Sequence, residues 1–366
     1  MFDPPQGLYT SEELLEGFSS EHTLGFTTTF DFSVFRAFAK EGGAVPKTLG
    51  IRRRQAEHDA SIGDGLRRFL KSHDRPIVGI MGGHSVARDD AAYRDLALLA
   101  SHLAEQNYLI VTGGGPGIME AAHFGVAFSG PNAAKFEEAL AILKGAARFP
   151  NLDGLIEDDG SIAPDMEGKL IQARDWLAAA LKARALAKGG LPVSLAIPTW
   201  LYGAEPTMPF ATHYGKYFQN SIREEALVNN SRAGIVYAHG GGGTLREIFQ
   251  DVELNFYAKK PEEFTPMIFF DKSGFWTSEP EIKGNVVVRD SIKLDQLVPN
   301  ILRTARLKMD RDQAKVKACL DKIYFVDAHA EIDRILQAHT PTAKSNLQFA
   351  LNALPLRIAI SKINRG

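Results

Sequence analysis

A run of glycines followed by threonine and glutamate is the stretch of this chain best suited to chemistry. It reads His239-Gly240-Gly241-Gly242-Gly243-Thr244-Leu245-Arg246-Glu247. Glycines leave backbone N–H groups unshielded. A helix start adds unpaired N–H groups and the positive end of the helix dipole. Residues 240–244 therefore have the composition of a phosphate-binding turn, and the Thr244 hydroxyl can reach the same anion.

Thr244 and Glu247 also have the spacing of a capping box. In that interpretation Thr244 is the helix N-cap, and Glu247 only returns a hydrogen bond to its backbone. A cap needs one small residue rather than four, so the glycine run favours a ligand-binding turn. Glu247 is then a candidate for charge-based catalysis, with the cap as the structural alternative.

A second glycine loop lies earlier in the chain, at Thr112-Gly113-Gly114-Gly115-Pro116-Gly117-Ile118-Met119-Glu120. We expect Gly113, Gly114, Gly115 and Gly117 to pack against the sugar or phosphate of a ligand. Glu120 is a candidate binding residue, although an acidic side chain is also favoured in any first helical turn. A third short loop supplies Gly83 and Ser85 as further candidate binding residues.

These three loops each follow a predicted buried strand and precede a predicted helix. The apolar runs predict strands at 77–81, 108–111, 193–197, 234–238 and 267–271. Strands alternating with helices indicate a Rossmann-like, doubly wound parallel sheet with helices on both faces. In such a sheet the loops lie at the carboxyl edge, where ligands bind.

The regular alternation covers only part of the chain. Residues 1–75 are predicted to form an N-terminal extension with a short helix near residues 62–70. Residues 76–366 are predicted to form the nucleotide-binding domain. A helical insertion at about 131–190 is interpreted as a lid or an oligomer contact. From about 285 we expect one more strand, at 286–288, and then a helical extension to the end.

Several ligand and reaction classes lack their sequence motif. Neither glycine loop has the third glycine of a dinucleotide fingerprint, and no P-loop is present. The ten histidines form no H-E-x-x-H pair, and the single cysteine cannot build a thiolate zinc site. We therefore expect a mononucleotide ligand, no metal and no cofactor. Four histidines are predicted to be structural: His84, His123, His213 and His239. His239 is the exception worth testing, because it abuts the phosphate turn and can carry charge near neutral pH.

The amino-acid composition limits the classes of partner and the cellular compartment that we expect. The net charge of −2 gives no reason to expect nucleic acid or an acidic membrane surface as a partner. The N-terminus has no secretory pattern, and there is no apolar run of about 18 residues that could span a membrane. One cysteine fits a reducing compartment. The expectation is a cytoplasmic protein.

Taken together, the motifs resemble the LOG ("lonely guy") family of nucleotide phosphoribohydrolases, often labelled "possible lysine decarboxylase". The family hallmark Pro-Gly-Gly-x-Gly-Thr-x-x-Glu is similar to residues 239–247, with His239 in place of Pro. The loop at 112–122 resembles the first glycine loop of the family. Arg223 occupies the position of the family arginine, and Gly274-Phe275-Trp276 is similar to its Gly-aromatic-aromatic. The chain looks like a long bacterial member.

This resemblance implies hydrolysis of the N-glycosidic bond of a nucleoside 5′-monophosphate, giving a free base and ribose 5-phosphate. It implies Arg223 and Glu247 as catalytic residues, the turn at 240–244 as the phosphate site, and a homo-oligomer, dimeric or larger. Two alternatives remain open: a non-catalytic nucleotide sensor of the same fold, and an enzyme acting on another ligand such as a sugar phosphate.

Overall fold

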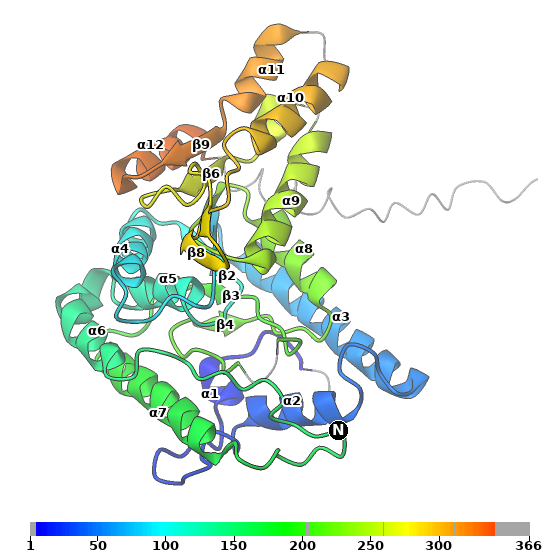
Figure 1. Cartoon of the computed structure of the whole chain (residues 1–366), viewed down its shortest axis with the longest axis vertical. Helices are drawn as coiled ribbons and strands as arrows, with labels where there is room; N and C mark the ends of the chain where they lie inside the picture. The colour runs from blue at the N-terminus through cyan, green and yellow to red at the C-terminus, as the bar shows by residue number, and fades with distance from the viewer. Residues whose placement is uncertain (1–4, 203–204, 259, 310–311, 341–366) are drawn as a thin grey trace, which may run out of the picture.

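The computed structural model describes residues 5–202, 205–258, 260–309 and 312–340. A seven-stranded parallel sheet runs through the centre in the order β4-β3-β2-β1-β5-β6-β9 (Figure 1). β1 pairs with β2 on one side and β5 on the other, and all its residues are buried. A strand that is covered by helices on both faces has a continuous run of apolar residues in its sequence. The bounds are Ile77–Met81 (β1), Leu109–Thr112 (β2), Leu195–Ala196 (β3), His213–Tyr214 (β4), Gly234–Tyr237 (β5), Met267–Phe270 (β6) and Ile323–Val326 (β9).

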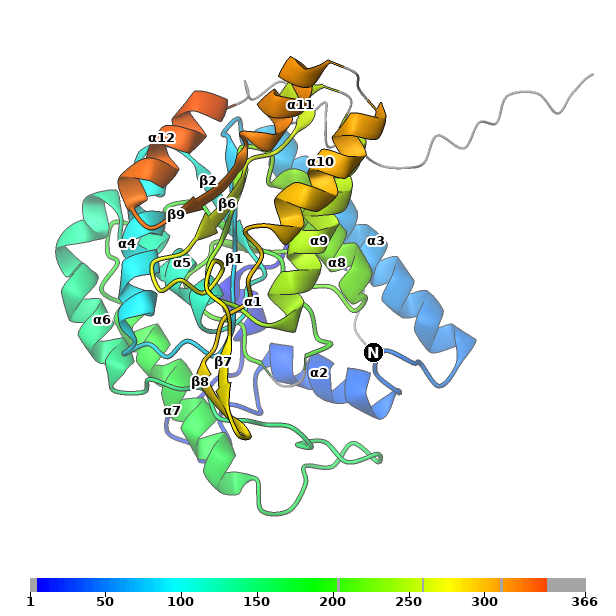
Figure 2. The same cartoon turned by 45° about the horizontal axis from the view of Figure 1, so that its top comes forward.

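Helices cover both faces of this sheet. Figures 1 and 2 show α4, α5 and α12 on one side, and α3, α8 and α9 on the other. The predicted doubly wound α/β architecture is therefore confirmed. In the described residues no helix has the length and apolarity needed to cross a membrane. The bounds are Leu49–Ser72 (α3), Ala91–Glu105 (α4), Ile118–Ala127 (α5), Asn220–Asn230 (α8), Gly242–Tyr257 (α9) and His329–His339 (α12).

The prediction of one strand followed only by helices beyond residue 285 is wrong. The strand at 286–288 is part of β8 (Val286–Arg289), which pairs with β7 (Glu281–Lys283) in a hairpin outside the main sheet. β9 joins the main sheet, with Ile323 opposite Met267. Its four residues lie between charged neighbours, so the apolar run is too short to separate a strand from a helix turn. Helices α10 (Leu297–Met309) and α11 (Gln313–Leu320), and the 3₁₀ turn η2 (Pro261–Glu263), complete this region.

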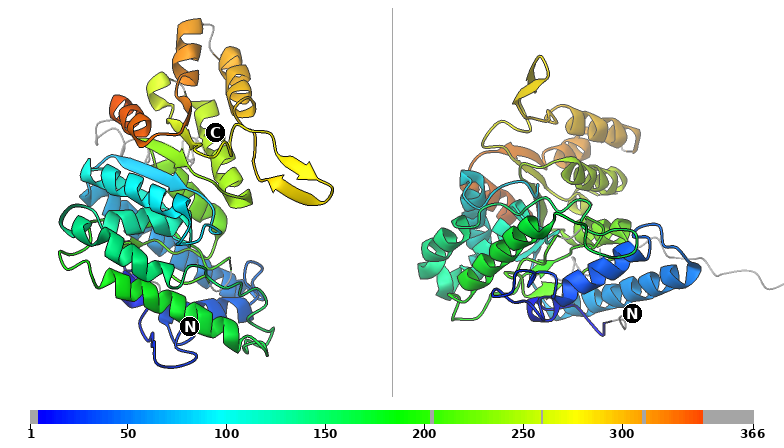
Figure 3. Two further views of the ribbon diagram at one scale, coloured as in Figure 1. Left: turned by 60° about the vertical axis from the view of Figure 1, so that its left-hand side comes forward. Right: turned by 60° about the horizontal axis from the view of Figure 1, so that its bottom comes forward.

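The N-terminal extension and the insertion lie together at one end of the molecule (Figures 1 and 3). Phe26 and Phe149 have ring centroids 6.3 Å apart, and Arg184 forms an ion pair with Glu12. The helix predicted near residues 62–70 is much longer and is α3, which starts at Leu49. The remaining elements are α1 (Ser11–Leu14), α2 (Phe30–Lys40), η1 (Gly130–Lys135), α6 (Phe136–Lys144) and α7 (Glu167–Arg184).

Two buried carboxylates tie the N-terminal helices to the carboxyl edge of the sheet. Asp31 on α2 accepts hydrogen bonds from Lys216 Nζ at 2.6 Å and from Trp200 Nε1 at 2.8 Å. Asp59 on α3 accepts from the backbone N–H groups of Phe218 and Gln219, both at 2.9 Å. The loops after β3 and β4 are therefore fixed from outside the sheet.

Candidate functional site

The loops after β1 and β5 meet at the point where the strand order reverses. From β1 the chain proceeds through β2, β3 and β4 on one side, and from β5 through β6 and β9 on the other. The backbone N–H of Gly83 donates to the carbonyl oxygen of His239 at 2.8 Å, which joins the two loops. This reversal is where ligands bind in open α/β sheets.

The glycine turn after β5 has free donors, but Thr244 does not cap it. α9 begins at Gly242 with Gly241 as its N-cap, and no side chain caps the helix. The capping-box interpretation is therefore wrong, because Thr244 lies inside the first turn. Its hydroxyl instead packs on Gly240, where a Cβ would approach Thr244 Oγ1 to 2.2 Å. Glycine is required there by close packing, and the first-turn N–H groups stay available for an anion.

Glu247 is engaged by Arg223 rather than by the helix backbone. Nη1 of Arg223 donates to Oε1 of Glu247 at 3.0 Å, and both side chains are buried. Burial raises the pKa of Glu247, and the Arg223 charge opposes that rise. Within the described residues, Nε of Arg223 is buried without a hydrogen-bond partner. An unpaired buried donor beside a carboxylate is suited to an oxygen of a ligand.

The first glycine loop lies against this ion pair. A Cβ at Gly113 would lie 3.4 Å from Nη1 of Arg223. Gly117 has a φ of +69°, and a Cβ there would lie 2.5 Å from the carbonyl oxygen of Gly83. The structure therefore brings together five of the predicted groups, namely Gly83, Gly113, Arg223, Glu247 and the turn at 240–244.

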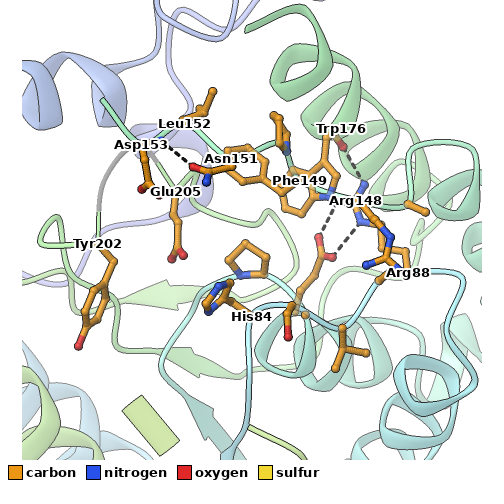
Figure 4. Close-up of a pocket in the computed structure, with 18 residues that line it drawn as sticks. His84, Arg88, Arg148, Phe149, Asn151, Leu152, Asp153, Trp176, Tyr202 and Glu205 are labelled. Atoms are coloured by element: carbon orange, nitrogen blue, oxygen red, sulfur yellow. Dashed lines mark hydrogen bonds and ion pairs between the residues drawn. The ribbon is translucent and has the colours of Figure 1, made fainter. Parts of the chain in front are cut away.

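A cavity of about 350 Å³ opens beside the first glycine loop (Figure 4). Its walls come from four parts of the chain: the loop after β1, the start of α5, the insertion with Trp176 of α7, and the loop after β3. Tyr202 connects the cavity to the ion pair, because it lines the cavity and its ring centroid lies 5.9 Å from Cζ of Arg223. Lining residues are His84, Ser85, Arg88, Pro116, Gly117, Glu120, Arg148, Phe149, Asn151, Asp153, Trp176, Tyr202 and Glu205.

Glu120 borders this cavity but its carboxylate is already held. Nη2 and Nε of Arg88 donate to its two oxygens at 2.6 and 2.9 Å, and Tyr93 donates at 3.2 Å. Arg88 also lies over the ring of Trp176, 3.7 Å from its centroid. All four side chains are almost fully buried. This cluster fixes α5 to the insertion and forms one end of the cavity.

The four histidines differ in their surroundings. His123 is fully buried between Thr112 Oγ1 and Ser194 Oγ, both at 2.9 Å, and burial lowers its pKa to about 3. Burial also lowers the pKa of His213. His84 lines the cavity. His239 has its ring 4.0 Å from that of Phe275 and its Nε2 3.5 Å from Asp290, at the base of the hairpin.

Sequence reasoning did not identify Tyr202, Glu205 or Phe149 as site residues. Tyr202 and Glu205 follow β3, so the carboxyl-edge rule applied to every strand would have found them. Phe149 comes from the insertion, and nothing in its local pattern shows which part of the sheet it covers. The Gly274-Phe275-Trp276 motif has a supporting role: Trp276 Nε1 donates to the Tyr237 carbonyl oxygen at 3.1 Å and fixes the end of β5.

The fold defines a Rossmann-like α/β protein with a cavity beside the first glycine loop, near its topological switch point. Residues 75–132, from β1 through α5, match the model of the SLOG cluster4 family. This match relates that part of the sheet to the SLOG superfamily, which includes enzymes and is compatible with a nucleotide-related function. The comparison with curated proteins found no match to the chain.

Proposed function

We propose that the protein hydrolyses the N-glycosidic bond of nucleoside 5′-monophosphates, releasing a free base and ribose 5-phosphate. The observation that carries the proposal is the buried Arg223–Glu247 pair, which lies between the first glycine loop and the first turn of α9. A carboxylate and a cation at a phosphate-type turn match what cleavage of a glycosidic bond requires.

The 5′-phosphate binds at the start of α9. Gly241, Gly242 and Gly243 are exposed, and no protein atom lies within 4 Å of a Cβ built on any of them. The free N–H groups of the first turn and the helix dipole favour an anion there. The unpaired Nε of Arg223 supplies a further donor to the phosphate or to a ribose hydroxyl.

Glu247 faces the ribose and stabilises the positive charge that develops at C1′ as the bond breaks. Such charge needs a fixed negative group in a site shielded from water. Burial favours the protonated form of Glu247, whereas Arg223 favours the ionised form. In the complex, the bound phosphate contacts Arg223. The positive charge that develops in the transition state favours the ionised form of Glu247.

The base occupies the cavity beside Tyr202. The volume of about 350 Å³ lies in the range of small-molecule sites, which is about 300–1,000 Å³. Phe149 and Tyr202 supply aromatic surface on its walls, and Asn151 supplies amide groups. The cavity is thus suited to a planar heterocycle with polar edges.

The test is incubation with a panel of nucleoside monophosphates, with ribose 5-phosphate and free base both measured. The proposal expects equal amounts of the two products and none from the corresponding nucleosides. A non-catalytic sensor predicts saturable nucleotide binding without either product. Release of inorganic phosphate with the glycosidic bond intact would contradict both.

A further inference from the structure

Four carboxylates lie around the crevice: Glu120, Glu247, Glu205 and Asp153. Arg88 and Tyr93 hold Glu120, and Arg223 holds Glu247. In the described part of the chain, no hydrogen bond or ion pair to the Glu205 carboxylate is found. Asp153, which also lines the cavity, is exposed, so Glu205 is the sheltered acidic side chain that remains available to a ligand.

The position of Glu205 is set by its neighbours on both sides in the sequence. Asp31 accepts from Trp200 Nε1 at 2.8 Å, and from the backbone N–H and hydroxyl of Thr207 at 3.0 and 2.8 Å. Glu205 Oε2 lies 3.2 Å from the position of a Cβ built on Gly115. Figure 4 shows its carboxyl group directed toward His84, with Tyr202 on the far side of the open space. The carboxyl group thus lies against the first glycine loop, on the wall of the cavity.

The charges around Glu205 leave it without a counterion of its own. His84, Lys216 and Arg223 are the basic groups that act on it, from the loops after β1 and β4 and from α8. Lys216 is paired with Asp31 and Arg223 with Glu247. Burial outweighs these charges and raises the pKa of Glu205. The protonated carboxylic acid is thereby favoured at a higher pH than for an exposed glutamate.

We infer that Glu205 is the general acid for the leaving base in the proposed reaction, opposite the ionised Glu247. This inference rests on the proposed function. As the C1′–N bond breaks, its electron pair goes to the base nitrogen, which takes the proton of the Glu205 carboxyl group. The water oxygen bonds to C1′, and one water proton passes to Glu247. Exchange with solvent returns both carboxyl groups to their starting states.

Glu247 and Glu205 have different roles in this proposal because their surroundings differ. Glu247 is bound to a cation and lies beside the phosphate turn, where negative charge stabilises C1′. Glu205 has no cation of its own and lies on the wall of the cavity that fits the base. A pair of carboxyl groups with opposite protonation states is the arrangement used in glycoside hydrolysis.

The experiment compares leaving groups that require a proton with ones that do not. AMP and GMP require protonation of the base, whereas nicotinamide mononucleotide and 7-methyl-GMP carry a cationic base that departs neutral. Glu205→Gln is expected to lower kcat on AMP by about 100-fold or more, and on the cationic substrates by less than about 5-fold. Glu247→Gln is expected to lower both. Glu253→Gln, exposed on α9 and not part of the cavity lining, is the control and should change neither.

The pH dependence of kcat with AMP as substrate is a second test of the role of Glu205. The wild type should lose kcat on the alkaline side as Glu205 ionises, and Glu205→Gln should lack that decline. An equal loss on AMP and on the cationic substrates, or an unchanged alkaline limb, would overturn the inference while leaving the proposed function intact. A wild-type protein that releases ribose 5-phosphate from no nucleotide would overturn the proposed function and this inference with it.

Discussion

Nη1 of Arg223 lies 3.0 Å from Oε1 of Glu247, and the two residues belong to different helices, α8 and α9. Their side chains are only 7% and 9% exposed, so the pair is shielded from water. Nε of the same guanidinium is left without a partner among the described residues. A pair built only for stability would use that donor as well, so the geometry favours a ligand next to Arg223.

Glu247→Gln removes the negative charge of the side chain and keeps its shape, so it tests whether turnover needs the charge. Gln is nearly isosteric and can still accept from Arg223, and α9 has no side-chain cap to lose. Turnover of nucleoside monophosphates should fall by about 100-fold or more, about 3 kcal/mol of barrier, with the protein still folded but its melting temperature lowered, because Arg223 loses its counterion. Release of ribose 5-phosphate is the measurement. Glu253→Gln, exposed on the same helix, is the control, and near-wild-type turnover by Glu247→Gln would return the residue to a structural role.

Removing only the cation should destabilise the fold. Arg223→Met leaves Glu247 buried without a partner, which costs on the order of 3–5 kcal/mol. The double variant Arg223→Met with Glu247→Met should recover most of that loss, because no uncompensated charge remains. Urea denaturation of the wild type, both single variants and the double variant measures the coupling. Additive losses would show that the two side chains do not depend on each other.

A methyl group added at Gly242 tests whether a phosphate binds at this turn. Gly242 has open space around it, so Gly242→Ala should fold at least as stably as the wild type. If a phosphate rests on the turn, the methyl group intrudes on it and nucleotide affinity should fall by about 10-fold or more, as measured by calorimetry with AMP. Gly63→Ala on α3 also enters open space and should leave affinity unchanged. Equal affinity in both variants would place the anion elsewhere.

We expect the protein to be a dimer or larger in solution. Phe249 and Tyr257 on α9 are 40% and 64% exposed, which leaves an apolar patch on the helix that carries Glu247. Light scattering should give a mass well above the 40.1 kDa of one chain. Replacing both aromatic residues by Glu should lower that mass, whereas Lys169→Glu on α7 should not. A constant monomer mass over a wide concentration range would contradict the expectation.

Asp251 should make stability fall as the pH rises. It is fully buried and accepts from Tyr237 at 2.9 Å, and burial raises its pKa from 3.8 to about 7. Folding therefore binds a proton between about pH 4 and pH 7, so this contribution is complete at low pH and lost as the pH passes 7. Relative to the wild type, Asp251→Asn should gain free energy of unfolding between pH 5 and pH 8. A pH-independent difference would remove Asp251 as the cause.

The sequence allowed most of the sheet and the helices around it to be predicted, because buried apolar runs and glycine loops carry strong local signals. β4, only two residues long, was not predicted. β9 was missed because four apolar residues between charges fit more than one element. The capping box was wrong because Gly241, not Thr244, precedes the first helical turn. Glu205 was overlooked because the carboxyl-edge rule was applied only to the glycine loops and not to the loop after β3. Pairing between distant residues such as Arg88 and Glu120 leaves no local pattern.

The contact between Asp31 and Lys216 also has a consequence for the order in which the chain can fold. The two residues are 185 positions apart, yet each supplies the buried charge that the other requires. A chain made from its N-terminus exposes the phenylalanines of α2 long before the loops after β3 and β4 exist. Contacts of such long range slow folding. The buried face of α2 is thus completed only after Lys216 has been synthesised, although α2 itself is made 185 positions earlier.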